Sequence, residues 1–252
     1  MKKLIYITAV ILLFSSCSNN IKTSNEVNLY SQRHYDVDKM LFERFEELTG
    51  VKVNVVKANA DELLERLKNE GENSPADLFV SVDAGKLHKA TELGLLQKIS
   101  NSSILDNISD DLEDKNGYWV PMTYRSRILV YSKERVQANE LSTYSDLLNE
   151  KWKNRILVRS SSNAYNQALL SSIVANKGSE AASEWASKLV SNFARDPKGS
   201  DRDQVKAIAA GQGDVAIVNS YYIGLLLSSD DEEQFKAGEA VGGFFPNQGE
   251  GE

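Results

Sequence analysis

The sequence has 252 residues, is 41% hydrophobic and carries a net charge of −7 at pH 7. This length and apolar content suffice for one large folded domain or two smaller ones. The acidic balance, with no block rich in Lys or Arg, excludes broad nucleic-acid binding.

The N-terminus has the pattern of an export signal. Two lysines precede an apolar stretch, residues 4–14, which is too short for an ordinary membrane span and suits a signal peptide. The single cysteine, Cys17, follows two serines and precedes a polar stretch, an arrangement that resembles a bacterial lipoprotein signal at residues 1–17. An ordinary secretory cleavage site that leaves a free thiol is the alternative. We expect an exported chain without an intrachain disulfide, with residues 18–26 as a tether.

Segments with strand and helix patterns alternate along the rest of the chain. Strand patterns occur at residues 27–30, 51–56, 76–82, 126–132, 155–158 and 214–218. Helix patterns occur at residues 36–50, 60–71, 84–94, 142–149, 180–193 and 200–214, and a further helix follows the strand within residues 154–175. The first helix has apolar residues at Leu41, Phe45 and Leu48, with Asp36 or Asp38 as its cap and Gly50 at its end. This alternation predicts an α/β protein whose mainly parallel sheet is covered by helices.

Side chains able to bind a ligand follow three of the predicted strands. They are His34 and Tyr35 after the first strand, Tyr165 after the strand at 155–158, and Tyr221 and Tyr222 after the strand at 214–218. In open α/β sheets the binding crevice lies beyond the carboxyl ends of the strands, so these five side chains could converge. Tyrosines that pack in the core with a bonded hydroxyl would give the same pattern.

The residue types favour a hard metal ion if the side chains do converge. A phenol has a pKa of about 10, and it ionises near neutral pH only beside strong positive charge, which a trivalent cation supplies. Helix N-termini add a smaller preference for the anion. Hard oxygen donors with one imidazole suit iron better than copper or zinc, and three or four tyrosinates would balance the charge of Fe³⁺.

Several longer motifs carry a family resemblance. They are "YSQRHYDVD" (30–38), "ADELLERLKNEGENSPADLFVSVDAGKL" (60–87), "STYSDLLNEKWKNRILVRSSSNAYNQALL" (142–170), "VSNFARDPKGSDRDQ" (190–204), "GQGDVAIVNSYYIG" (211–224) and "FFPNQ" (244–248). Together they cover nearly all of the expected mature chain. The chain resembles the tyrosine-rich group of periplasmic ferric-iron-binding proteins of ABC import systems.

The resemblance implies a periplasmic-binding-protein-like α/β fold with two lobes that close about a hinge, each with a mainly parallel sheet flanked by helices. Lobe 1 would comprise residues 27–122, with residues 240–252 returning to it, and lobe 2 residues 123–239. Family members continue beyond the "FFPNQ" motif, so the resemblance implies an incomplete N-terminal lobe and leaves a truncated, non-functional remnant as an alternative.

The resemblance also implies a function and a set of ligands. Fe³⁺ would be held in the cleft between the lobes by His34, Tyr35, Tyr165, Tyr221 and Tyr222. Arg125, in "TYRSR" (123–127), would hold a synergistic anion such as carbonate or stabilise a tyrosinate, and a surface or hinge ion pair is the alternative. The implied protein is a monomeric, membrane-anchored lipoprotein of the periplasm or cell surface that delivers iron to an ABC permease in the inner membrane.

Two other classes of function remain open. The same fold could bind another solute, such as a polyamine, thiamine or an oxyanion, with the tyrosines stacking or hydrogen bonding. An enzyme is disfavoured, because the sequence lacks the G-x-S-x-G and H-E-x-x-H motifs and has only two histidines.

Overall fold

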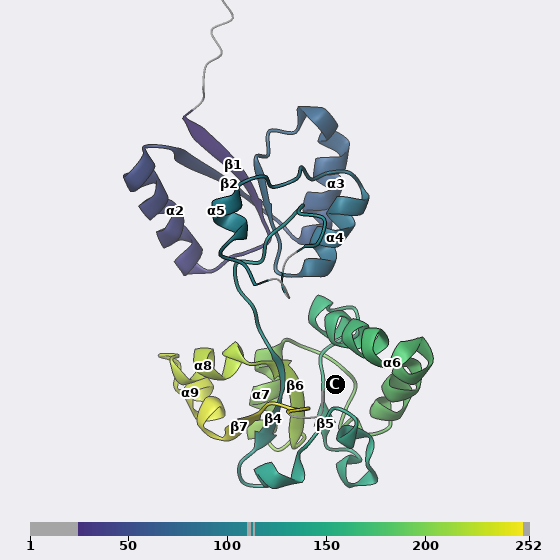
Figure 1. The fold of residues 1–252 in the computed structure, drawn as a ribbon. Coiled ribbons are helices and arrows are strands. Elements are labelled where there is room, and N and C mark those ends of the chain that lie inside the picture. Colours follow the sequence, from purple (N-terminus) through teal and green to yellow (C-terminus); the bar gives the residue numbers. More distant parts are fainter. Residues whose placement is uncertain (1–24, 110–111, 113, 249–252) are drawn as a thin grey trace, which may run out of the picture. The chain divides into compact units, whose positions relative to one another are not determined.

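The structure, a computed structural model, describes residues 25–109, 112 and 114–248 (Figure 1). The chain forms two compact units that divide between Val82 and Asp83, earlier than the expected boundary at residue 122. The predicted signal peptide, Cys17 and most of the predicted tether lie outside the described residues. Within the described ranges, no helix has both the length and the apolar character needed to cross a membrane.

The first unit contains a parallel sheet. Its described strands are β1 (Glu26–Ser31), β2 (Lys52–Lys57) and β3 (Leu78–Val80), arranged in the order β2–β1–β3. Its described helices are α2 (Asp36–Thr49), α3 (Ala60–Glu70) and a short 3-10 helix (Gly71–Asn73). Leu29 of β1 lies opposite Val55 of β2 and Leu78 of β3 in parallel register. The strand–helix alternation and the parallel sheet predicted here are confirmed.

Helix α3 forms the core of this unit with β1. Asn59 and Glu62 make a reciprocal capping box at its start, which satisfies backbone N–H groups that would otherwise lack partners. Leu63, Leu64 and Leu67 are buried. Figure 1 shows α3 on one side of β1 and β2 and α2 on the other.

Helix α2 begins and ends where the sequence predicts, but its start is capped differently. Tyr35 occupies the N-cap position and its side chain makes no capping hydrogen bond, so the predicted Asp cap is wrong. Asp38 instead accepts a hydrogen bond from Arg33 Nη2 at 2.8 Å. Gly50 ends the helix in the left-handed region, with a φ of 68°, as predicted.

The apolar face of α2 is exposed. Its large side chains are between 43% and 68% exposed, namely Val37, Met40, Leu41, Phe45 and Leu48. The spacing thus predicts the helix correctly, although no part of the chain that the structure describes buries this face.

The second unit contains a four-stranded sheet among its described residues. The strands are β4 (Arg127–Ser132), β5 (Ile156–Leu157), β6 (Val215–Asn219) and β7 (Val241–Phe244). The helices are α4 (Ala84–Glu92), α5 (Ser102–Leu105), α6 (Ala164–Val190), α7 (Asp201–Ala209), α8 (Tyr221–Leu227) and α9 (Glu232–Glu239). Short 3-10 helices occur at Ala138–Glu140, Asp146–Leu148 and Glu150–Trp152.

The sheet of the second unit is mixed, with strand order β5–β6–β4–β7. Strands β5 and β6 are parallel, but β4 runs antiparallel to both β6 and β7. The mainly parallel sheet predicted for this unit is therefore wrong. The reason is that β4 enters the sheet where β6 ends, with Arg127 opposite Asn219.

Strand β7 lies in the second unit and does not return to the first. It pairs with the free edge of β4, where Gly242 lies opposite Tyr131. Beyond it, the Asn247 backbone N–H donates to the Ser142 carbonyl oxygen at 3.1 Å. The predicted return of residues 240–252 to lobe 1 is wrong for residues 241–248. The backbone of β7 pairs with β4, and Asn247 bonds to Ser142, so these residues belong to the second unit.

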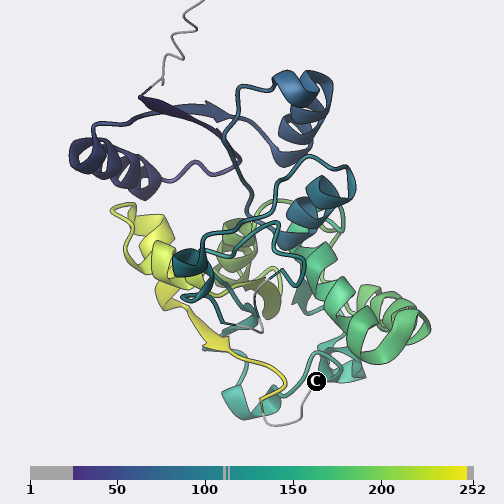
Figure 2. The same cartoon turned by 45° about the horizontal axis from the view of Figure 1, so that its top comes forward.

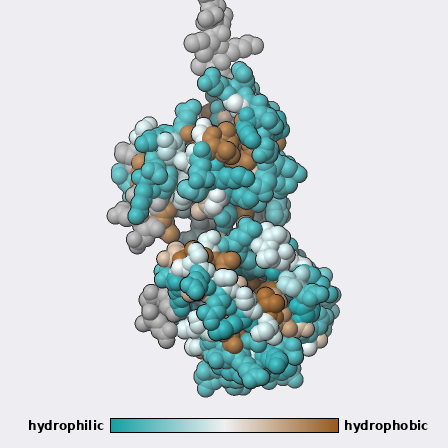
Figure 3. All heavy atoms as spheres, turned by 90° about the vertical axis from the view of Figure 1, so that its right-hand side faces the viewer, coloured by the Kyte–Doolittle hydropathy of each residue, from teal (hydrophilic) through white to brown (hydrophobic). Residues whose placement is uncertain are grey.

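Strand alternation divides the core of the second unit between the two faces of the sheet. Leu129 and Ile217 face a cluster that includes Trp152 and Trp185 of the α6 side. Ile128 and Val218 face the opposite cluster, which contains residues of α7 and α8. Figures 1 and 2 show α6 apart from α7, α8 and α9. Figure 3 shows mostly hydrophilic residues on the face of the molecule that it presents.

We predict that Gly242→Ala destabilises the second unit. A Cβ at this position would overlap the Tyr131 ring, and overpacking of this kind costs about 1–3 kcal/mol. Gly224→Ala in α8 is the matched control, since its Cβ would meet no atom within 4 Å. It should leave stability unchanged or raise it by up to about 1 kcal/mol. Urea unfolding measures both, and equal effects would contradict the packing argument.

We also predict an acid-dependent contribution from Asp214, which precedes β6. Burial raises the pKa of Asp214, but hydrogen bonds from Arg135 and Arg155 outweigh it and hold the pKa below its ordinary value. The stabilisation is therefore complete above pH ~4 and is lost as the pH falls through the lowered pKa of the folded state. Asp214→Asn should cost about 1–3 kcal/mol at pH 7, and the difference from wild type should shrink on acidification. A difference in unfolding free energy that stays constant from neutral to acidic pH would refute this.

Candidate metal centre

His34 and Tyr35 lie together in the loop between β1 and α2 of the first unit. Their rings stack with centroids 4.9 Å apart and planes 21° from parallel. The preceding Arg33 pairs with Asp38, which fixes this loop to the first turn of α2. His34 is exposed and Tyr35 is half-buried, so both side chains are accessible to a ligand.

Tyr221 and Tyr222 form the first turn of α8, directly beyond the carboxyl end of β6. Their ring centroids are 4.4 Å apart, with the planes at 36°. Tyr222 is buried and Tyr221 half-buried. Burial raises the pKa of Tyr221, and hydrogen bonds with the Tyr222 and Tyr165 hydroxyls raise it further, while a hydrogen bond with Asn219 opposes them.

Tyr165 belongs to the same cluster. It lies in the first turn of α6, which Asn163 caps by accepting a hydrogen bond from the Tyr165 backbone N–H at 3.0 Å. Its hydroxyl reaches that of Tyr221 although 56 positions separate them in the chain. The structure thus brings together three of the five predicted ligands, all in the second unit. Their role as ligands, and that of His34 and Tyr35, stays a prediction.

Three guanidinium groups surround the Tyr165 ring. Their Cζ atoms lie 4.4, 5.5 and 5.9 Å from its centroid, in Arg125, Arg159 and Arg127 respectively. Arg125 also pairs with Asp83 at 2.8 Å, an ion pair of the kind that the sequence left as an alternative. Its predicted part in holding an anion stays a prediction.

The sequence analysis does not predict the buried charges beside Tyr165. Arg127 donates to Asp201 Oδ2 at 2.6 Å, and the side chains of the pair are 8% and 0% exposed. Arg159 Nη1 lies 3.5 Å from the other carboxylate oxygen of Asp201. The signal that could have found them is a charged residue at the start of an otherwise apolar strand pattern, "RILVY", because a buried charge requires a partner.

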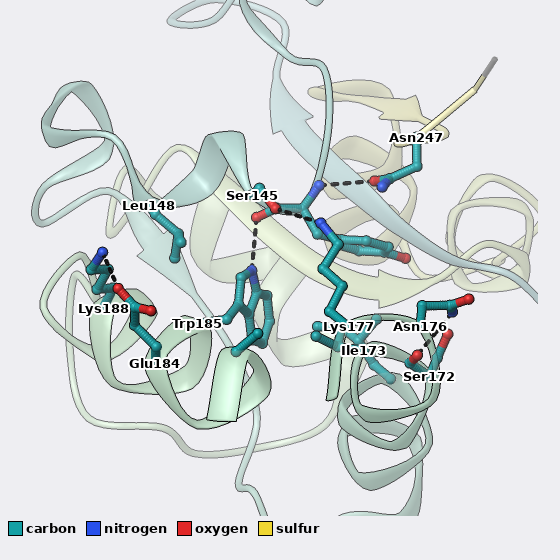
Figure 4. Close-up of a pocket in the computed structure, with 13 residues that line it drawn as sticks. Ser145, Leu148, Ser172, Ile173, Asn176, Lys177, Glu184, Trp185, Lys188 and Asn247 are labelled. Carbon is teal, nitrogen blue, oxygen red and sulfur yellow. Dashed lines mark hydrogen bonds and ion pairs between the residues drawn. The ribbon is translucent and has the colours of Figure 1, made fainter. Parts of the chain in front are cut away.

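The phenols are the metal-binding candidates of this unit. Among the described residues, no group of three or more His, Cys, Asp or Glu side chains is placed to hold a metal ion. A groove of about 250 Å³ lies elsewhere, between the 142–148 segment and α6, and its lining includes Leu148, Ile173, Lys177 and Trp185 (Figure 4). It contains none of the predicted ligands, so it is separate from the tyrosine cluster.

Comparison with known proteins relates the chain to iron-binding proteins. Iron uptake protein A1 of Synechocystis sp. is 46% identical over 223 residues, which are 88% of this chain and 62% of that protein. A Trichodesmium protein solved in complex with iron and citrate ligands is 48% identical, with a TM-score of 0.85 over 88% of this chain and 71% of that one. The ferric binding protein from Campylobacter jejuni is 41% identical, with a TM-score of 0.83 and the same coverage.

The match is extensive on this chain and partial on its relatives. The chain spans less than two thirds of the length of the curated Synechocystis relatives, 62% and 65%. Residues 73–244 match the family model described as bacterial extracellular solute-binding protein. These residues make up more than half of the chain, and the chain therefore belongs to the bacterial extracellular solute-binding protein family.

Proposed function

We propose that this chain captures ferric iron and delivers it to the permease of an ABC importer. The observation that carries the proposal is the convergence of Tyr165, Tyr221 and Tyr222 from the first turns of two separate helices. The names of the relatives, which refer to iron uptake and ferric iron binding, support it and describe transport proteins rather than enzymes.

The chemistry of the cluster suits a small trivalent cation. Three phenolates carry a charge of −3, which balances Fe³⁺, and hard oxygen donors are the ligands that this ion prefers. Burial raises the pKa of Tyr221, so in the metal-free protein its hydroxyl is neutral at pH 7. Iron must therefore displace protons as it binds.

The surrounding charge argues against an organic cation. A polyamine or thiamine would leave the phenols neutral and would face Arg125, Arg127 and Arg159. Ferric iron instead converts the phenols into anions, which the same guanidinium groups stabilise. The arginines thus favour a cargo that ionises its own ligands.

The remaining members of the ligand set belong to the proposal. Tyr35 would supply a fourth phenolate and His34 an imidazole, and both lie side by side after β1. Arg125 would hold an anion such as carbonate beside the iron, in addition to its pair with Asp83.

The cellular setting is also proposed. The family name indicates an extracellular solute-binding protein, consistent with a periplasmic or cell-surface location. We propose that Cys17 carries a lipid anchor and that the protein acts as a monomer with an inner-membrane permease as its partner.

The ferric complex should absorb visible light through charge transfer from tyrosinate to iron. Tyr221→Phe combined with Tyr222→Phe should weaken and shift this band and lower ferric affinity by at least 100-fold, because it removes two of the anionic ligands and leaves Tyr165 and Tyr35. Absorbance titration with a ferric chelate measures both quantities.

Tyr131→Phe is the control for this experiment, since Tyr131 lies on β4 against Gly242 and is not among the predicted ligands. It should keep the band and the affinity. A protein that is loaded with one equivalent of ferric iron and remains colourless would refute the proposal.

Iron binding should release protons and weaken as the pH falls. Phenols are protonated at neutral pH, with an ordinary pKa of about 10, and each must lose its proton to bind the metal as tyrosinate. Calorimetry in buffers of different ionisation enthalpy should report release of about two to four protons per iron. Binding without proton release would show that the phenols are not the ligands.

A further inference from the structure

The side chain of Arg127, at the start of β4, is hydrogen-bonded to three other elements of the second unit. Its Nη1 donates to Asp201 Oδ2 at 2.6 Å and to Asn219 Oδ1 at 3.1 Å. Its Nη2 donates to Asn166 Oδ1 at 2.7 Å and to the Ile217 carbonyl oxygen at 2.9 Å. One planar, buried guanidinium group thus fixes β4, β6, α6 and α7 relative to one another.

Two of these partners lead directly to tyrosines. Asn166 is the neighbour of Tyr165 in the first turn of α6, and its Nδ2 donates to the Arg159 carbonyl oxygen at 2.8 Å. Asn219 lies two residues before Tyr221, and its Nδ2 is 3.4 Å from the Tyr221 hydroxyl. The side-chain oxygen of each amide accepts a hydrogen bond from Arg127, so the arginine sets the orientation of both amide groups.

Asp201 holds Arg127 in this place. Its carboxylate is 0% exposed, and besides Arg127 it accepts the Asn219 backbone N–H at 2.9 Å. The first bond ties α7 to β4, and the second ties α7 to the end of β6, where the chain turns into the tyrosine pair. Without the carboxylate, the buried guanidinium would lose its counter-charge and reorient.

We propose that the Arg127–Asp201 ion pair is the positioning element of the tyrosine cluster, holding Tyr165 and Tyr221 at a separation that one ferric ion can bridge. The link to iron rests on the proposed function, whereas the positioning itself is a property of the metal-free protein. Neither Arg127 nor Asp201 contacts the metal in this proposal. Their positioning effect acts through Asn166 and Asn219, in addition to the positive charge that Arg127 places 5.9 Å from the Tyr165 ring.

The opposite end of β6 offers a matched control. Asp214 also binds two arginines, Arg135 at 2.5 Å and Arg155 at 2.6 Å, but at the start of the strand rather than at its tyrosine-bearing end. Asp201→Asn and Asp214→Asn each remove one negative charge from a carboxylate shared by two arginines. Only the first should affect the phenols. Arg127→Lys is a second test variant, since it keeps the charge opposite Asp201 and loses the forked geometry.

The experiment uses the full chain labelled with 3-fluorotyrosine, without metal, and assigns fluorine NMR signals with Tyr165→Phe, Tyr221→Phe and Tyr222→Phe. In Asp201→Asn and Arg127→Lys the signals of Tyr165 and Tyr221 should shift or split, while in Asp214→Asn they should stay at their wild-type positions. The same variants are then titrated with a ferric chelate. Asp201→Asn should lose about 10- to 100-fold in affinity and shift the charge-transfer band, whereas Asp214→Asn should do neither.

The outcomes separate this proposal from the proposed function. If the wild type binds no iron, the proposed function fails. The fluorine signals of the metal-free protein still test whether Arg127 and Asp201 position the tyrosines. The positioning proposal would be overturned if the fluorine signals did not move in folded Asp201→Asn and Arg127→Lys. It would also be overturned if Asp214→Asn shifted the signals as much as these two variants do. In a wild type that binds iron, shifted signals without a loss of ferric affinity would also overturn it.

Discussion

Each end of strand β6 is fixed by a carboxylate bonded to arginines, and the position of the phenols depends on the carboxylate at the end where the strand leads into the tyrosine pair. All five residues of β6 are buried, with Asp214 just before the strand and Asp201 beside its last residue. Buried charges of this kind are costly unless each is paired and hydrogen-bonded. The pairing of Asp201 therefore permits few alternative positions for the last residue of β6, and the turn that carries Tyr221 and Tyr222 follows directly from that residue.

The convergence of the second-unit tyrosines could be predicted because it follows from local rules. Strands β5 and β6 are parallel neighbours, so their carboxyl ends meet at one edge of the sheet. The sequence marks both ends, since Asn163 caps the helix after β5 and the tyrosine pair begins the helix after β6. A residue in the first turn after either strand must then lie at that shared edge.

The rest of the second unit depends on contacts that leave no local signal. Arg127 and Asp201 are 74 positions apart, and no periodicity links the start of one strand to the first turn of a distant helix. The direction of β4 and the pairing of β7 with its free edge are also long-range choices. In the first unit, the spacing of Leu41, Phe45 and Leu48 predicts an amphipathic helix, but it does not say what would lie against that face.

The charge balance of the cluster is the reason why ferric iron, the proposed cargo, would suit it better than the other candidate ligands. Arg127 and Arg159 share the one carboxylate of Asp201, and the Nε atom of each is buried without a hydrogen-bond partner among the described residues. The metal-free site is therefore short of negative charge. An oxyanion would supply that charge but would gain little from three clustered phenols, and an organic cation would increase the deficit. Under the proposed function, Fe³⁺ would ionise the phenols and so create beside the arginines the anions that they lack.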